Sequence, residues 1–334
     1  MKALVVVRPG QLELRDVQRP EPGPREALVK IDACGICGTT DRELIAGTQP
    51  YHNEYPAILG HESTGIVVEV GAECRKFKVG DRVTRPAAII AGGHRDGLAS
   101  CWGGFAEYGL VREAAAGSAP DYNEERELVV DGRLTPAQAV LAISLAETAS
   151  WTWQLPPLGG RAVVVSGTGC AGLTIAKWCK MAGARVCVLG RRDERLATAR
   201  RIAADAVVNV KTEPDAVAAI RVFAPEGADI FCDACGAKDQ IVLAARVCRE
   251  GGLWARYAVE PPGGYDEPEG GAPRLKRTIP EAREHVAYAW ASDALLRGTV
   301  RTEDFLTREW PLDDYADAFA AVARGEVLKG MLTI

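Results

Sequence analysis

The residues best suited to chemistry lie in two short stretches near the N-terminus, residues 34–41 and 60–62. The first reads Cys-Gly-Ile-Cys-Gly-Thr-Thr-Asp, and the second reads Gly-His-Glu. Together they offer thiolate, imidazole and carboxylate groups, a mixed ligand set that zinc accepts. We therefore expect an open, catalytic zinc site in the first third of the chain.

The spacing of Cys34 and Cys37 also occurs in thiol–disulfide redox sites. A redox site of that kind sits in a small βαβ domain, whereas the residues before Cys34 alternate like β-strands and are interrupted by proline and glycine. We favour Cys37 as a metal ligand with Cys34 packed nearby. The alternative is a thiol oxidoreductase, which would join the two cysteines in a disulfide and lack zinc.

Size and composition narrow the classes of protein further. A chain of 334 residues, 47% hydrophobic and 25% charged, is long enough for two globular domains. Its formal net charge of −5 leaves no basic excess for a nucleic acid. Ten cysteines are too few for a disulfide scaffold, and no apolar run reaches the roughly 18 residues that cross a bilayer. We expect a cytoplasmic protein without nucleic-acid or membrane partners.

The elements that must position these side chains differ between the two halves of the sequence. Segments 2–7, 11–16 and 27–33 have the alternating pattern of strands, and the third leads directly into Cys34. Further strand-like runs follow Gly60, Gly80 and Gly103. These patterns predict a β-rich, partly barrel-like first domain. The last segment, 329–334, is also strand-like and is expected to pair with that domain.

The second half has the alternating strand and helix pattern of a nucleotide-binding domain. A buried strand at 161–165 is followed by a glycine-rich turn, a helix at 173–182 and a second strand at 184–189. This order supports a dinucleotide fingerprint, whose glycines let the backbone approach a pyrophosphate at the helix N-terminus. The fingerprint residues are Gly167, Thr168, Gly169, Cys170, Ala171 and Gly172.

The ordered set of motifs, completed by Gly80-Asp81-Arg82-Val83 and Gly103–Tyr108, resembles the zinc-dependent medium-chain dehydrogenase/reductase family, in its alcohol and polyol dehydrogenase branch. The resemblance covers essentially the whole chain. It implies an α/β protein with a β-rich, GroES-like, partly barrel-shaped catalytic domain at 1–142 and 295–334. A doubly wound Rossmann domain that binds the cofactor would occupy 143–294.

The resemblance also implies roles for single residues around the metal. Cys37 and His61 correspond to two zinc ligands, and the third in the polyol branch is a glutamate just before the cofactor domain. Glu147 matches that position, in a helix pattern at 136–153 whose other residues around it are mostly apolar. A solvated helix carboxylate is the alternative reading of Glu147. Glu62 corresponds to a carboxylate beside the metal that is an occasional fourth ligand.

Two features depart from the family pattern. The motif after Cys37 is one residue longer than usual, so either Thr39 or Thr40 would relay the alcohol proton, with Thr39 favoured. Residues 84–103 contain Cys101 and His94 in place of the four cysteines that hold a structural zinc in many relatives. We therefore expect one catalytic zinc and no structural zinc. His52 is a further candidate as a proton acceptor.

The end of the second Rossmann strand bears on the choice of cofactor. NAD enzymes carry an acidic residue there, but this chain has Gly190 followed by Arg191 and Arg192, which suit a 2′-phosphate. We expect NADP to be preferred over NAD. By resemblance, Lys329 would reach the cofactor pyrophosphate. The second Cys-x-x-Cys pair, at 232 and 235, is interpreted as packing near the cofactor.

The activity implied by this resemblance is reversible hydride transfer between a secondary alcohol and NAD(P). The substrate would be a small polyol, cyclitol or sugar-like molecule, oxidised to a ketone by an enzyme that forms a dimer or tetramer. One alternative is a zinc-free quinone or enoyl reductase of the same fold. The other is a non-catalytic NADP-binding protein.

Overall fold

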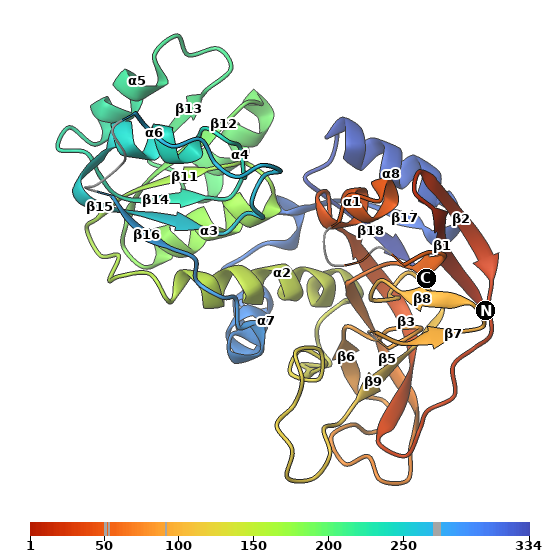
Figure 1. Ribbon diagram of the computed structural model, residues 1–334. Coiled ribbons are helices and arrows are strands. Elements are labelled where there is room, and N and C mark those ends of the chain that lie inside the picture. Colours follow the sequence, from red (N-terminus) through yellow and green to blue (C-terminus); the bar gives the residue numbers. More distant parts are fainter. Residues whose placement is uncertain (50–51, 53, 91, 270–274) are drawn as a thin grey trace. The chain divides into compact units, whose positions relative to one another are not determined.

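The computed structural model describes residues 1–49, 52, 54–90, 92–269 and 275–334. The chain forms two compact units, one made of Met1–Ser144 with Tyr288–Ile334 and the other of Leu145–Ala287 (Figure 1). Helix α2 (Pro136–Thr152) crosses the boundary between them. In the described part of the chain, no helix is both long and apolar enough to cross a membrane.

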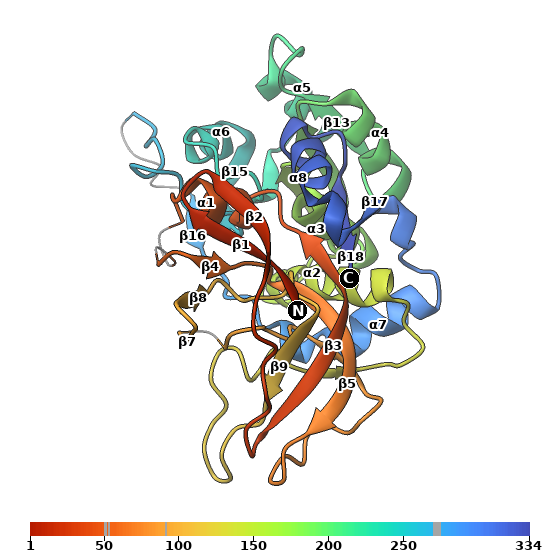
Figure 2. The same ribbon diagram turned by 90° about the vertical axis from the view of Figure 1, so that its right-hand side faces the viewer.

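The first unit is built on two mixed sheets. The smaller has the order β2 (Gln11–Asp16), β1 (Lys2–Arg8), β4 (Ala57–Ile58), β8 (Leu98–Ser100) and β7 (His94–Arg95). The larger has the order β10 (Val129–Val130), β6 (Arg82–Thr84), β5 (Glu62–Val70), β3 (Glu26–Ile36), β18 (Lys329–Thr333) and β17 (Leu306–Pro311), and β9 (Tyr108–Arg112) also pairs with β3. The long strands β3 and β5 lie side by side in Figure 2. Over the described residues these sheets do not close into a barrel.

The C-terminal strand completes the first unit. Strand β18 pairs antiparallel with β3, so that Leu332 lies opposite Cys34, and parallel with β17. The predicted pairing of the last segment with the N-terminal domain is therefore confirmed. Short helices accompany these strands: α1 (Thr40–Ala46), α7 (Tyr288–Leu296), α8 (Tyr315–Arg324) and the 3₁₀ turns Thr302–Asp304 and Leu312–Asp314.

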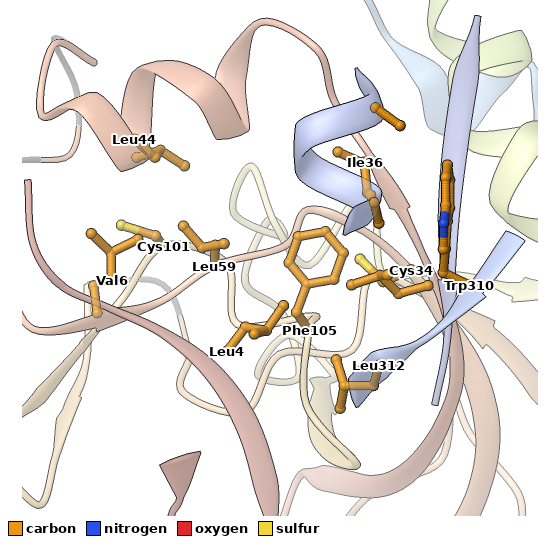
Figure 3. Close-up of a cluster of buried hydrophobic side chains, with 14 of the residues drawn as sticks. Leu4, Val6, Cys34, Ile36, Leu44, Leu59, Cys101, Phe105, Trp310 and Leu312 are labelled. Carbon is orange, nitrogen blue, oxygen red and sulfur yellow. The ribbon is translucent and has the colours of Figure 1, made fainter. Parts of the chain in front are cut away.

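A hydrophobic cluster joins the two ends of the chain on one face of β3, the strand that contains Cys34. Leu4, Cys34 and Phe105 are fully buried in it and lie near Trp310 (Figure 3). Leu332, on β18, is a fully buried member of the same cluster. Burial raises the pKa of the Cys34 thiol well above its ordinary value, so this cysteine behaves as a small apolar side chain. Cys34 therefore has a packing role in the core.

The second unit is a parallel sheet with the order β13 (Ala206–Asn209), β12 (Arg185–Gly190), β11 (Ala162–Ser166), β14 (Ala228–Asp233), β15 (Cys248–Arg256) and β16 (Lys276–Thr278). Helices α3 (Cys170–Met181) and α4 (Asp193–Ile202) cover one face, and α5 (Ala216–Phe223) and α6 (Gln240–Val247) cover the other; the 3₁₀ turn Glu284–Val286 follows (Figure 1). This is the Rossmann strand order, and the point where it reverses lies between β11 and β14. The predicted Rossmann fold is confirmed.

Gly65 provides a test of the pairing between β3 and β5. A Cβ atom at Gly65 would lie 2.3 Å from the Lys30 carbonyl oxygen and 2.8 Å from the Ile31 Cα, and these backbone atoms cannot move aside cheaply. We expect Gly65→Ala to lower the free energy of unfolding by about 3 kcal/mol. Gly132→Ala is the control, because no atom lies within 4 Å of its Cβ position. Urea unfolding followed by circular dichroism measures both, and equal midpoints would contradict the expected clash.

Candidate metal and cofactor sites

Three potential metal ligands converge in the first unit. One ligand atom each from Cys37, His61 and Glu62 lies within 4.8 Å of the others. Cys37 follows the end of β3, and His61 and Glu62 come at the beginning of β5, opposite the same end of β3. A thiol, an imidazole and a carboxylate gathered at this spacing form a donor set suited to zinc.

Two glycine motifs hold the Gly-His-Glu turn in place. Gly60 has a φ of +109°, and a Cβ there would lie 2.5 Å from the Phe105 nitrogen. The Gly104 N–H donates a hydrogen bond to the Gly60 carbonyl oxygen at 2.7 Å, and the Phe105 N–H donates to the Leu59 carbonyl oxygen at 2.9 Å. The segment around Gly104 thus braces the backbone that presents His61. The two motifs are far apart in sequence and meet only in the fold.

Asp41 is the residue that orients this site, a role not predicted from the sequence. It is fully buried, and its carboxylate accepts a hydrogen bond from the Cys37 N–H at 2.8 Å. Its other oxygen lies 3.3 Å from Nδ1 of His61. A carboxylate at Nδ1 fixes the ring and leaves Nε2 for a metal. An aspartate in the first turn of a helix, four residues after a candidate ligand, was the available signal.

The electrostatics of the site favour a positive charge beside His61. Burial alone lowers the pKa of the imidazole, but Asp41 and the Cys37 thiol outweigh it and raise the pKa well above its ordinary value. The same groups that stabilise a proton on the ring would stabilise a bound cation. The residues present therefore fit a zinc ion.

Glu62 is held by a buried ion pair with Lys329, whose side chain is 4% exposed. The other carboxylate oxygen of Glu62 accepts a hydrogen bond from the Ser144 hydroxyl at 3.4 Å. Burial opposes ionisation of Glu62, but Lys329 and then His61 outweigh this and keep its pKa below the ordinary value. A Cβ at Gly35 would lie 2.4 Å from the Glu62 carboxylate and 3.2 Å from the Lys329 side chain. Only glycine at position 35 leaves room for this pair.

The other residues predicted near the metal are placed as follows. Thr39 is exposed just before α1, and Thr40 is the half-buried first residue of that helix. Glu147 is half-buried in the part of α2 that belongs to the second unit, so its ligation stays a prediction. His52 packs on Trp102, with ring centroids 4.2 Å apart. Burial, and then His61, lowers the pKa of His52.

The glycine-rich turn of the second unit has the geometry its sequence predicted. Gly167 has a φ of +120°, and a Cβ at Gly172 would lie 2.1 Å from the Gly167 carbonyl oxygen. Gly169 precedes helix α3, no side chain caps the helix there, and no atom lies within 4 Å of its Cβ position. Thr168 lies in the glycine-rich turn itself, and Cys170 and Ala171 are the first two residues of α3. The helix N-terminus can therefore meet a phosphate at close range.

The end of β12 has little room for a side chain at position 190. A Cβ at Gly190 would lie 2.5 Å from the Thr168 side chain and 3.0 Å from that of Leu196. The next carboxylate, Asp193, accepts a hydrogen bond from the Asn209 side chain at 2.7 Å. Arg191 is exposed and Arg192 half-buried at this strand end.

The second Cys-x-x-Cys pair borders the glycine-rich turn. Cys232 is fully buried in β14, and the Cys235 thiol lies 3.6 Å from the Ser166 hydroxyl. A Cβ at Gly167 would lie 3.3 Å from the Cys235 Cβ. Among the described residues, no group of metal-binding side chains includes this pair.

Comparisons with known proteins agree with this geometry. Residues 23–121 match the alcohol dehydrogenase GroES-like domain, and residues 170–276 match the zinc-binding dehydrogenase domain. The chain is 28% identical to D-arabitol-phosphate dehydrogenase of Enterococcus avium, over 99% of this chain and 97% of that protein. It is 33% identical to a Mycobacterium tuberculosis protein named probable alcohol dehydrogenase, over 70% of this chain and 68% of that protein.

A solved structure shows the same likeness in three dimensions. A zinc-binding dehydrogenase of Sinorhizobium meliloti bound to NADP superposes with a TM-score of 0.83 at 26% identity, covering 100% of this chain and 99% of that one. The chain therefore belongs to the zinc-dependent medium-chain dehydrogenase family and is an oxidoreductase that exchanges hydride between a small alcohol and NAD(P).

Proposed function

We propose that this protein oxidises a polyhydroxylated secondary alcohol to a ketone, reversibly, with a single zinc ion and with NADP as the preferred cofactor. The observation that carries the proposal is the cluster of Cys37, His61 and Glu62, with Asp41 behind His61. The likeness to D-arabitol-phosphate dehydrogenase along nearly the whole chain supports a polyol-type substrate.

The residues of the site have the following proposed roles. Cys37 and His61, with Glu147 as the third ligand, would hold the ion, and Asp41 orients the imidazole. When bound, zinc would supply Lewis-acid chemistry that lowers the pKa of the substrate hydroxyl, and NADP would supply the hydride acceptor. The Thr39 or Thr40 hydroxyl would pass the alcohol proton towards solvent.

A single zinc is supported by the environment of Cys101. This thiol is buried among apolar side chains of the core, and burial raises its pKa to about 12. His94 is exposed and lies 2.6 Å from the Glu54 carboxylate. In the described part of the chain, neither residue belongs to a group that could hold a metal.

We propose further that the protein works in the cytoplasm as a homo-oligomer, as the family resemblance implies. Its ten cysteines are free thiols, which suits a reducing compartment. Light scattering during size-exclusion chromatography gives the oligomeric state directly, and a monomer at micromolar concentration would overturn that part of the proposal.

Removal of the Cys37 thiol tests the metal site. We expect the purified protein to contain about one zinc per chain, and Cys37→Ala to lose both the metal and alcohol oxidation because one of three protein ligands is gone. Cys34→Ala is the matched control: its buried thiol packs in the core and should leave the zinc content unchanged. Plasma mass spectrometry measures the metal. A Cys37→Ala protein that retains its zinc and activity would refute the site.

A second pair of variants distinguishes the roles of Glu62 and Glu147 in zinc binding. Glu62 is already engaged by Lys329 and Ser144, whereas Glu147 is the proposed third ligand. We expect Glu147→Gln to weaken zinc binding by at least about tenfold in competition with a chelator, and Glu62→Gln to weaken it less. Glu62→Gln should instead destabilise the fold, because it leaves the Lys329 ammonium buried without its partner. The reverse order of zinc affinities would assign the third ligand to Glu62.

The NADP preference rests on the arginines after Gly190. Arg195, one turn into α4, is half-buried, and burial followed by the charge of Arg192 lowers its pKa. Guanidinium groups crowded at this strand end favour an anion such as the 2′-phosphate. Gly190 cannot be replaced by the acidic residue of NAD enzymes without displacing Thr168.

Substitution of Arg192 tests this preference. We expect Arg192→Ala to raise the Kd for NADPH by about tenfold to a hundredfold and to change that for NADH little, because only NADPH carries the phosphate. Arg200→Ala is the control, because Arg200 is exposed near the other end of α4, the helix that follows Arg192. Fluorescence titration of both cofactors measures the affinities. If Arg192→Ala weakens the binding of NADPH and NADH equally, the proposed role of Arg192 is wrong.

A further inference from the structure

A small cavity adjoins His61 within the first unit. Its volume is about 10 Å³, which is room for roughly one water molecule. Gly60, His61, Arg85 and Trp102 form part of its wall. The other polar wall residues are Ser63 on β5, and Asn123 and Glu127, which lie between β9 and β10, past the end of the matched GroES-like region.

Two residues of the cavity wall, Arg85 and Trp102, are held in an unusual backbone conformation. Arg85 and Trp102 have φ angles of +58° and +68°, in the left-handed region that bulky residues rarely adopt. Such strain persists only where the surroundings impose it, and it is concentrated at functional sites. Here the Arg85 N–H donates to the Ser63 carbonyl oxygen at 2.8 Å, and its guanidinium donates to the His61 carbonyl oxygen. The Trp102 ring lies 5.2 Å from the His61 ring, centroid to centroid.

The polar side offers hydrogen-bonding groups with fixed positions. Glu127 is 4% exposed, and one carboxylate oxygen accepts a hydrogen bond from the Arg112 N–H. The other oxygen lies 3.8 Å from Nε of Arg112, beyond hydrogen-bond distance. Burial raises the pKa of this carboxyl to about 7, so that it can serve as a donor or an acceptor near neutral pH.

Asn123 adds an amide to the same wall. Its backbone is anchored, because its carbonyl oxygen accepts hydrogen bonds from the N–H groups of Arg126 and Glu127 at 2.8 and 3.0 Å. Its own N–H donates to the Asp121 carboxylate at 2.8 Å. Its side-chain amide makes no hydrogen bond to any other residue in the described part of the chain. The amide is therefore available to a ligand.

We propose that this cavity is a hydroxyl subsite, in which Asn123 and Glu127 bind the hydroxyl next to the reacting carbon of a vicinal diol. Trp102 would pack against the C–H face of the same substrate. The inference rests on the proposed function and specifies its substrate class. A cavity that holds one water-sized group and presents an amide and a carboxyl matches one hydroxyl group. An alcohol without that hydroxyl would leave these groups unpaired and be selected against.

The test compares 2,3-butanediol with 2-butanol, each as its separate stereoisomers. We expect the wild type to prefer a diol in kcat/KM, and Asn123→Ala to reduce that preference by about tenfold to a hundredfold. Glu127→Gln, which keeps the shape of the side chain, should reduce the preference less. Glu125→Gln, the same substitution two residues away and outside the cavity wall, should leave the preference unchanged.

Two further measurements distinguish an error in the subsite from an error in the proposed function. Zinc content and thermal midpoint show whether each variant is folded, and ligand-observed NMR gives the affinity for both alcohols without turnover. If 2-butanol and the diol are oxidised equally well, or Asn123→Ala lowers both rates equally, the subsite is wrong and alcohol oxidation stands. If neither alcohol is oxidised, the proposed function falls, and the NMR affinities still decide the subsite: equal binding of diol and mono-alcohol refutes it.

Discussion

The buried ion pair between Lys329 and Glu62 is the interaction on which the first unit most depends. It joins β18, at the end of the chain, to β5 across β3, and Gly35 makes room for it on the strand between them. Loss of either partner would leave a buried charge, at a cost of about 3–5 kcal/mol. Because Glu62 follows His61 directly, the pair also anchors the backbone of a candidate metal ligand. The last strand is therefore part of the site as well as part of the fold.

The site combines strong local constraints with contacts between distant segments. Cys37 and Asp41 are four residues apart and are held together by a hydrogen bond at the start of α1, so this half of the site is nearly preformed. His61 depends on the Gly104 segment, which reaches it through the backbone contact with Gly60. Rigid support of this kind keeps metal ligands close to their working geometry before the ion arrives.

Backbone sterics also govern the second unit. Gly172 packs directly on Gly167, which brings helix α3 against the sheet and leaves its N-terminus open to a phosphate. Gly190 packs on Thr168, so a side chain at position 190 would have to displace that of Thr168. The close approach of these two turns therefore limits which side chains fit at the end of β12.

The sequence by itself determined what short-range patterns encode. The strand, glycine turn and helix around Gly167, the family, and the closing strand at β18 all followed from local periodicity and motif order. The tertiary structure alone decided which distant groups meet: Asp41 at His61, Lys329 at Glu62, and the cavity wall formed by Trp102 and Asn123. Those contacts depend on strand register and on backbone approach between segments, and neither leaves a periodic signal in the chain.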